Sequence, residues 1–408
     1  MNLVRNRALG VYISIPFCRS KCTYCNFASG VYPASKHGHY VNRLVQDLEQ
    51  SGAWARSMAV DLPRQVDSVY LGGGTPSLLA PKLVTQLFGA LHSELDLDPD
   101  AEITVECAPS QLADETLEAL VAAGVNRVSL GVQSFIDSEA KVSGRHHTRA
   151  IVLDDIRRLR AAGIPNLNLD LIAGLAGQTF ASWEESLSVL IDAGAPHASV
   201  YMLEVDEDSR LGREMLSGGA RYHAALVPAD DAIARMYEVA IEKLEQAGLL
   251  QYEISNFSHP GSESSHNLRY WQRRPYLGLG LDASSMLREA LQPEDAASET
   301  SVLRSTVTDD LANYLANEPL AETAWLSPGQ QHEEAWFLGL RLNAGVDVAA
   351  LQQEFGREMV APALEVVEQL AATGLLASNG KTVRLTERGR LLSNEVFQEF
   401  LGLCAPRR

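Results

Sequence analysis

The sequence predicts an α/β fold: an open, partial (β/α)6 barrel like part of a TIM barrel, followed by a smaller C-terminal domain that is mainly helical and winged-helix-like. Two observations support this prediction. Strand-like and helix-periodic segments alternate six times along the first part of the chain. Polar residues lie at or near the ends of several predicted strands. Strands separated by helices form parallel sheets, so these strand ends should meet at one rim.

Six segments have the apolar, β-branched composition of buried strands, and helix-periodic segments lie between them. The strands are expected at residues 11–15, 66–71, 102–106, 127–132, 166–172 and 198–203. The helices are expected at residues 39–56, 81–95, 114–123, 149–162, 182–193 and 228–247. One more strand is expected at residues 251–257.

The chain is expected to divide into a barrel domain at residues 1–290 and a C-terminal domain at residues 291–408. The uneven, acidic stretch 290–308 is interpreted as the link between them. Residues 374–385 resemble the end of a helix followed by a small β-wing. A winged helix often binds DNA, but the acidic chain and the attached barrel favour a structural or lid role here.

Length, charge and cysteine content bound the class of protein. A chain of 408 residues can bury a large core, and a formal charge of −18 argues against a nucleic-acid partner. Cys107 and Cys404 lie far apart, so no disulfide framework is indicated. The sequence has neither a signal peptide nor an apolar run of transmembrane length. These features predict a cytoplasmic location.

Three of the five cysteines, Cys18, Cys22 and Cys25, fall within eight residues in the spacing Cys-x3-Cys-x2-Cys. Thiolates so close together repel one another unless a metal takes up their charge, so a metal site is indicated. A zinc site needs four protein ligands, and His37 or His39 could supply the fourth. A cubane 4Fe-4S cluster fits the three cysteines better, because its fourth iron can stay open to a small chelating ligand.

This cysteine spacing, together with Gly72-Gly73-Gly74-Thr75-Pro76, resembles the radical S-adenosylmethionine (SAM) superfamily. The resemblance implies a 4Fe-4S cluster held by Cys18, Cys22 and Cys25, with SAM chelating the open iron. It also implies the open partial barrel of the radical SAM type. The remaining SAM-contact positions map by resemblance onto Tyr12, Phe27, Gly73, Gly74, Thr75, Glu106, Gln133, Arg145 and Asp170.

Within that superfamily the chain resembles the HemN/HemW branch, which contains oxygen-independent coproporphyrinogen III dehydrogenases and related heme chaperones. The resemblance rests on residues 12–27, 72–76, 124–135, 168–172 and 252–280, and it implies a HemN-type C-terminal domain. In the dehydrogenases a fourth cysteine follows two positions after the third, whereas Phe27 stands there in this chain. The chain also lacks their N-terminal extension. Both features resemble the chaperone group.

The segment His266-Asn267-Leu268-Arg269-Tyr270-Trp271 matches the His-Asn-x-x-Tyr-Trp signature of the chaperone group, in which the histidine is implicated in holding heme. A neutral imidazole is a good axial ligand for heme iron. Tyr270 and Trp271 could offer apolar surface to a porphyrin. The alternative interpretation of His266 is a hydrogen-bonded core histidine.

Several positions depart from the family pattern. Cys107 and Ala108 stand where Ala and Asn are usual, so an amide near the site is missing. Ala173 and Ala176 replace Tyr and Pro, and Asp282 and Ser284 alter a usual glycine and histidine. These changes affect the expected shape of the substrate pocket and leave the cluster motif intact.

The resemblance therefore implies a heme chaperone that binds a 4Fe-4S cluster, SAM and heme and passes heme to acceptor hemoproteins, membrane-bound respiratory enzymes among them. No residue is assigned a catalytic role. The alternative function is oxygen-independent coproporphyrinogen III dehydrogenase, a radical oxidative decarboxylation, and Phe27 counts against it. A third interpretation is a scaffold whose cluster is only structural.

Overall fold

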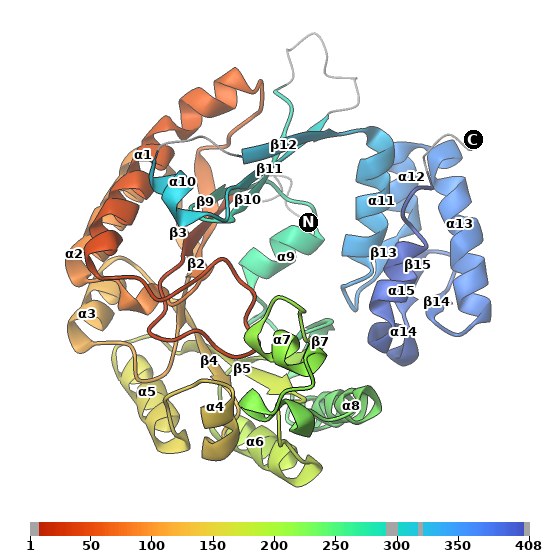
Figure 1. The fold of residues 1–408 in the computed structure, drawn as a ribbon. Coiled ribbons are helices and arrows are strands. Elements are labelled where there is room, and N and C mark those ends of the chain that lie inside the picture. The colour runs from red at the N-terminus through yellow and green to blue at the C-terminus, as the bar shows by residue number, and fades with distance from the viewer. Residues whose placement is uncertain (1–7, 291–300, 317–320, 404–408) are drawn as a thin grey trace.

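The computed structural model describes residues 8–290, 301–316 and 321–403. Twelve strands form one sheet in the order β12-β11-β10-β9-β1-β2-β3-β4-β5-β6-β8-β7. The sheet is curled, with helices on its outer face, and the C-terminal domain lies beside the barrel (Figure 1). The predicted α/β class, with an open partial barrel and a smaller C-terminal domain, is confirmed.

All six predicted barrel strands form, and neighbours in sequence pair in parallel. They are β1 (Leu9–Ile15), β2 (Gln65–Gly73), β3 (Asp96–Cys107), β4 (Arg127–Gln133), β5 (Asn166–Ala173) and β6 (His197–Met202). In β1 all residues but Tyr12 are buried, as expected for a strand covered on both faces. Parallel pairing brings the carboxyl ends of the strands, and the loops that follow them, to one rim.

The predicted helices cover the outside of this sheet (Figure 1). They are α1 (Ser35–Ser57), α2 (Pro81–Glu94), α3 (Asp114–Ala122), α5 (Arg149–Ala161), α6 (Phe180–Asp192) and α8 (Asp230–Gln246). Each has an apolar stripe that packs inward; α1, for example, buries Tyr40, Leu44 and Leu48. Shorter elements lie between or after them: η2 (Pro76–Leu78), α4 (Asp137–Val142), α7 (Arg210–Leu216), η3 (Arg221–Leu226), α9 (Ser265–Trp271) and α10 (Leu311–Leu315).

Two expectations about the later strands need correction. The strand expected at residues 251–257 is a pair of short antiparallel strands, β7 (Leu250–Glu253) and β8 (Asn256–Ser258). In the stretch interpreted as a link, residues 302–307 form β11 (Val302–Val307), which extends the barrel sheet. It lies between β10 (Ser284–Arg288) and β12 (Ala321–Leu326), and β9 (Tyr276–Leu279) joins this group to β1.

The C-terminal domain has its own core. Its helices are α11 (Pro328–Gly339), α12 (Val348–Phe355), α13 (Arg357–Ala372), α14 (Glu387–Leu391) and α15 (Ser393–Gln398). A small sheet consists of β13 (Val346–Asp347), β14 (Leu376–Ser378) and β15 (Thr382–Leu385), and the β14–β15 hairpin is the expected wing. Trp336 and Phe400 stack at 5.1 Å in the core. The expected domain boundary at residue 290 stays a prediction, since residues 291–300 lie outside the described part of the chain.

No helix in the described residues is long and apolar enough to cross a membrane.

Tyr40 ties the end of β1 to the end of β9. Its hydroxyl donates to the Ser14 carbonyl oxygen at 2.7 Å and accepts from the Leu281 N–H at 2.8 Å. Gly280 makes room for this hydroxyl: a Cβ there would lie 2.5 Å from the Tyr40 oxygen, and its φ of +89° disfavours other residues. A helix side chain thus fixes the backbone just before the cysteine loop.

We predict that Tyr40→Phe lowers the free energy of unfolding by about 1–3 kcal/mol, because one buried carbonyl and one buried N–H lose their partner. Urea unfolding of the two proteins measures the difference. Tyr32→Phe, at a partly exposed position near the same helix, serves as the control. A Tyr40→Phe protein as stable as the wild type would contradict the prediction.

Candidate functional site

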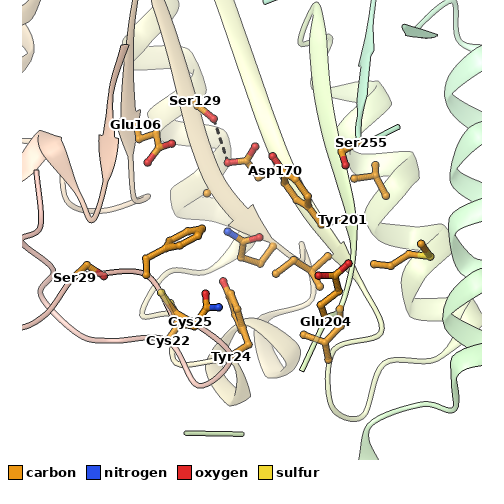
Figure 2. A pocket seen from close by; sticks show the side chains of 18 of the residues that line it. Cys22, Tyr24, Cys25, Ser29, Glu106, Ser129, Asp170, Tyr201, Glu204 and Ser255 are labelled. Carbon is orange, nitrogen blue, oxygen red and sulfur yellow. Dashed lines mark hydrogen bonds between the residues drawn. The ribbon is translucent and has the colours of Figure 1, made fainter. Parts of the chain in front are cut away.

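A cavity of about 790 Å³ opens at the carboxyl ends of the barrel strands. The cysteine loop, the triple-glycine loop, the ends of β3 to β6 and the C-terminal domain all contribute to its wall. In Figure 2, Glu106, Asp170 and Tyr201 point into it from the strands, and Cys22, Tyr24 and Cys25 lie on the loop across from them. The predicted strand-end residues and the cysteine loop therefore line one common, open cavity.

The cysteine loop is held by its own backbone and by one lysine. The Cys18 N–H donates to the Gly30 carbonyl at 2.9 Å, which closes the loop at its base. Lys21 Nζ donates to the carbonyls of Phe27 and Ser29 at 3.1 and 3.2 Å. Cys18, Cys22 and Cys25 are all partly buried, and all line the cavity. Phe27 lines it too, with 64% of its surface exposed.

The triple-glycine loop packs directly on the start of the cysteine loop. The Gly74 N–H donates to the Ile15 carbonyl at 2.9 Å, and the Thr75 N–H donates to the Phe17 carbonyl at 2.8 Å. A Cβ on Gly74 would lie 2.8 Å from both of these oxygens, so only glycine fits. Thr75 Oγ1 lies 4.0 Å from Cys18 Sγ. The two motifs are therefore one structural unit.

Glu106 and Asp170 are two carboxylates on neighbouring parts of the cavity wall. Glu106 accepts from the Tyr70 hydroxyl at 2.9 Å and from the Gly73 N–H at 3.2 Å. Burial raises the pKa of Glu106 to about 7, and the negative charge of Asp170 adds to this effect. Burial also raises the pKa of Asp170, although hydrogen bonds from Asn168 and serine hydroxyls oppose it. Such a pair favours a ligand that brings positive charge or hydrogen-bond donors.

A chain of buried polar groups orients Asp170 from behind. Asn168 Nδ2 donates to Asp170 Oδ1 at 2.6 Å, which leaves Asn168 Oδ1 to accept from His197 Nδ1 at 2.6 Å. The Tyr252 hydroxyl then donates to His197 Nε2 at 2.9 Å. Burial keeps the pKa of His197 well below its ordinary value, so this imidazole is neutral. A small cavity of about 50 Å³ lies among these residues.

Arg145 and Gln133 line the cavity near the cysteine loop. Arg145 Nη2 donates to the Tyr24 hydroxyl at 3.3 Å, and its buried Nε has no hydrogen-bond partner. Gln133 has a φ of +68°, which is uncommon for a residue other than glycine and turns the chain at the end of β4. A partly buried guanidinium with an unused donor is suited to bind a carboxylate.

Two of the predicted site residues lie away from the cavity wall. Tyr12 is on β1 inside the barrel, where its ring stacks on Tyr70 at 6.1 Å. His266 is on α9 and only 1% exposed. Its Nδ1 lies 3.0 Å from Ser68 Oγ, and its Nε2 lies 2.9 Å from the Tyr270 hydroxyl. Burial and the charge of Arg274 lower the pKa of His266 to about 3. In this conformation His266 is a neutral histidine with both nitrogens hydrogen-bonded.

Sequence patterns did not identify several residues of the site. Tyr70, on the neighbouring strand, donates a hydrogen bond to Glu106. The sequence could have indicated this role, because Tyr70 lies two residues before Gly72 and therefore on the same face of the strand. Arg341 and Asn394 of the C-terminal domain also line the cavity. No local pattern pointed to them, because they reach the site only through the packing of the two domains. Cys107 and Ala108, the departures from the family pattern, line it as well.

The donor set fits an iron–sulfur cluster. Burial raises the pKa values of the Cys18 and Cys25 thiols, and the nearby thiols raise them further, so these thiolates need a positive partner. No group of three His, Cys, Asp or Glu side chains among the described residues could hold one metal ion. A cubane does not need such a group, because each cysteine binds a different iron. Arg145 and the two carboxylates complement the carboxylate and amino groups of SAM.

Comparison with known proteins gives family matches over both domains. Residues 12–190 match the radical SAM superfamily, and residues 326–392 match the HemN C-terminal domain. The chain is 35% identical over 394 residues to the heme chaperone HemW of Bacillus subtilis (strain 168), covering 96% of this chain and 98% of that protein. It is 29% identical over 403 residues to heme chaperone HemW of Escherichia coli (strain K12), covering 98% of this chain and 100% of that protein.

Among solved structures, the chain is similar to the coproporphyrinogen III oxidase HemN from Escherichia coli, a radical SAM enzyme. The TM-score is 0.79 with 22% sequence identity, and the match covers 97% of this chain and 90% of that one. At this identity the likeness concerns the fold alone.

The raised pKa of Glu106 predicts a pH-dependent effect of Glu106→Gln on stability in the absence of SAM. An ordinary glutamate ionises near pH 4.5, whereas folded Glu106 ionises near 7. Between these values the folded state holds the proton and the unfolded state does not, so the wild type loses stability as pH rises through this window. The Glu106→Gln variant does not lose stability in this way, because the glutamine amide does not ionise. We expect the variant to gain on the order of 2 kcal/mol relative to wild type between pH 4.5 and pH 8.

Urea unfolding of both proteins at the two pH values measures this gain. The difference between variant and wild type at pH 4.5 measures any change in packing that the amide introduces, and it is subtracted from the difference at pH 8. A stability difference that does not vary with pH would contradict the raised pKa.

Proposed function

The chain belongs to the radical SAM superfamily and, within it, to the family of the proteins named heme chaperone HemW; from this premise we propose that it is a heme chaperone. In this proposal the protein binds a 4Fe-4S cluster, SAM and heme, and it passes heme to acceptor hemoproteins. The observation that carries the proposal is the shared cavity, where three thiols, the triple-glycine loop and the strand-end polar residues meet. The names of the relatives support heme as the cargo.

Cys18, Cys22 and Cys25 would hold the cluster, and the loop after β2 would hold SAM next to it. Gly73 and Gly74 present backbone at the cavity wall, where no side chain shields it. Glu106 and Asp170 would accept from the amino group or the ribose hydroxyls of SAM, and Arg145 would pair with its carboxylate. When bound, the cluster and SAM supply one-electron chemistry. The protein's part is to fix SAM and shield it from water, and the positive group of SAM would keep Glu106 ionised.

Heme binding through His266 stays a prediction. In the present structure it would require two changes around the imidazole. An axial bond to Nε2 requires the Tyr270 hydroxyl to leave, and the ring must become accessible from its present 1% exposure. Because the imidazole is neutral, no proton has to be removed first. Heme loading by this route would therefore be coupled to a local opening of α9.

Acceptor hemoproteins, including membrane-bound respiratory enzymes, are the proposed recipients. We propose a cytoplasmic location for two reasons. Cys107 and Cys404 lie far apart in the sequence and indicate no disulfide framework, and a thiolate-bound cluster needs reducing surroundings.

The alternative function is the radical oxidative decarboxylation catalysed by oxygen-independent coproporphyrinogen III dehydrogenases. The same cavity could admit a porphyrinogen, but Phe27 occupies the position of the fourth cysteine of that group. We expect reconstituted protein, given coproporphyrinogen III, SAM and reductant without oxygen, to form no protoporphyrinogen IX. Formation of that product would replace the chaperone assignment with the enzymatic one.

Alanine substitution of Cys18, Cys22 or Cys25 is predicted to remove most of the bound iron and sulfide after anaerobic reconstitution, since each thiolate holds one iron. Cys107→Ala is the matched control, because Cys107 is a buried cysteine that lines the same cavity. Burial raises the pKa of its thiol to about 12, which makes it a poor metal ligand. Iron analysis decides the outcome: loss of the cluster in Cys107→Ala, or its retention in the other three variants, would refute the ligand assignment.

A pair of variants tests His266. His266→Ala should weaken heme binding about tenfold or more and shift the Soret band, because the axial ligand is lost. Tyr270→Phe should strengthen heme binding, because it removes the hydrogen bond that competes for Nε2. Absorbance titrations with ferric heme measure both effects, with the exposed His39→Ala as control. Unchanged spectra and affinities in both variants would leave His266 as a core residue.

A further inference from the structure

Unpaired polar atoms gather where the barrel meets the C-terminal domain. Arg341, which follows α11, lies over the ring of Trp271 with 4.2 Å between its guanidinium carbon and the ring centre. Its Nη2 lies 3.7 Å from Glu253 Oε2, which is too long for a hydrogen bond. Arg341 Nε, Trp271 Nε1 and Glu253 Oε2 are all buried and have no hydrogen-bond partner. Arg341 and Trp271 therefore each have a donor that no acceptor among the described residues uses.

Arg341 is held firmly in this place. The next residue, Leu342, forms a β-bridge with Glu253, and the Asn343 N–H donates to the Tyr252 carbonyl at 3.0 Å. The stacking on Trp271 fixes the plane of the guanidinium. The Arg341 side chain is 25% exposed, and it lines the large cavity. A guanidinium fixed in this way loses little side-chain entropy when it binds an anion.

The cavity has a cation at each of two separate walls. Arg145 lies beside the cysteine loop, where it serves the SAM carboxylate in the proposed function. Arg341 belongs to the C-terminal domain, and it is the cation contributed by that domain among the described residues that line the cavity. The third lining cation, Lys21, is committed to the carbonyls of Phe27 and Ser29. One SAM molecule has one carboxylate, so a ligand carboxylate at Arg341 would have to come from a second ligand.

The cavity that the two arginines share also has apolar and aromatic lining that suits a flat, apolar molecule. Leu203, Ile254 and Leu391 line it together with Tyr201 and Tyr237. Glu204 and Glu395 also line the cavity and would repel a carboxylate placed beside them. Glu253 already pairs with Arg341, with 3.7 Å between Oε2 and Nη2, so an entering carboxylate would share the guanidinium with it. Arg341 lines the cavity and Trp271 does not, so the carboxylate would meet the exposed part of the Arg341 side chain, while the indole supports the guanidinium from behind.

We propose that Arg341, oriented by Trp271, binds a propionate carboxylate of a tetrapyrrole that occupies this part of the cavity. The proposal rests on the proposed function, because it takes a tetrapyrrole as the ligand. It assigns Trp271 a different role from that of a porphyrin platform: the indole positions the arginine. It also gives the C-terminal domain a direct part in ligand recognition.

Ligands with and without free carboxylates test the proposal on the full-length protein. Wild type, Arg341→Ala and Arg341→Lys are titrated, without SAM, with four probes: ferric heme, its dimethyl ester, metal-free protoporphyrin IX and its dimethyl ester. Arg388→Ala is the matched control, because Arg388 is an exposed arginine of the same domain that does not line the cavity. Thermal unfolding of each variant shows whether the fold is kept.

We expect Arg341→Ala to weaken binding of both free acids by about tenfold or more and to leave the affinities of both esters unchanged. Arg341→Lys should fall between, because it keeps the charge and loses the stacked, forked geometry. Equal losses for acids and esters would mean that Arg341 only joins the domains, and this would overturn the proposal. Unchanged affinity for the acids would also overturn it.

The probes separate this proposal from the function on which it rests. If wild type binds the acids but Arg341→Ala binds them equally well, only the carboxylate assignment fails. If wild type binds neither the iron-containing nor the metal-free acid, the heme chaperone function fails, and the carboxylate assignment fails with it. Metal-free protoporphyrin has no iron to bind an axial ligand. An effect of Arg341→Ala on its affinity therefore cannot arise from His266.

Discussion

The whole site depends on the parallel pairing of β1 with β2. This ladder runs to the pair Ile15 and Gly73, and it continues past the strand ends through the hydrogen bonds from Gly74 to Ile15 and from Thr75 to Phe17. The cysteine loop and the triple-glycine loop are far apart in sequence, and only this register places them side by side. A shift of one residue would turn every side chain of β1 to the opposite face. The glycines are needed because a Cβ at Gly74 would collide with those carbonyl oxygens.

The electrostatics of the cavity explain why a SAM-like ligand suits it. Burial raises the cost of ionising Glu106 and Asp170, the charge of Asp170 adds to the cost for Glu106, and Arg145 keeps an unused donor in the same cavity. A ligand with both an ammonium and a carboxylate can neutralise the two carboxylates with its ammonium and pair its carboxylate with Arg145. The chain from Tyr252 through His197 and Asn168 presents Asp170 in one orientation. Binding there therefore costs little reorganisation of the protein.

The sequence was sufficient for the features that depend on local pattern. Strand composition and helical periodicity located the six barrel strands and their helices, and the cysteine and glycine motifs located the rim that holds the site. Features set by tertiary packing were not predictable. The turn at Ile254 and Ser255, which splits the expected strand into β7 and β8, contains neither glycine nor proline. Arg341 reaches the cavity only because the C-terminal domain packs on the barrel. The imidazole of His266 is hydrogen-bonded to Ser68 and to Tyr270, and Ser68 is distant in sequence.

The central claim is that three thiolates hold a cluster whose fourth iron is open to SAM. The most direct test is the Mössbauer spectrum of 57Fe-reconstituted protein, recorded with and without SAM. The account predicts that SAM changes the signal of one iron of the four and leaves the other three as they were. Four irons that all ignore SAM, or a preparation that reconstitutes with zinc and no sulfide, would contradict it.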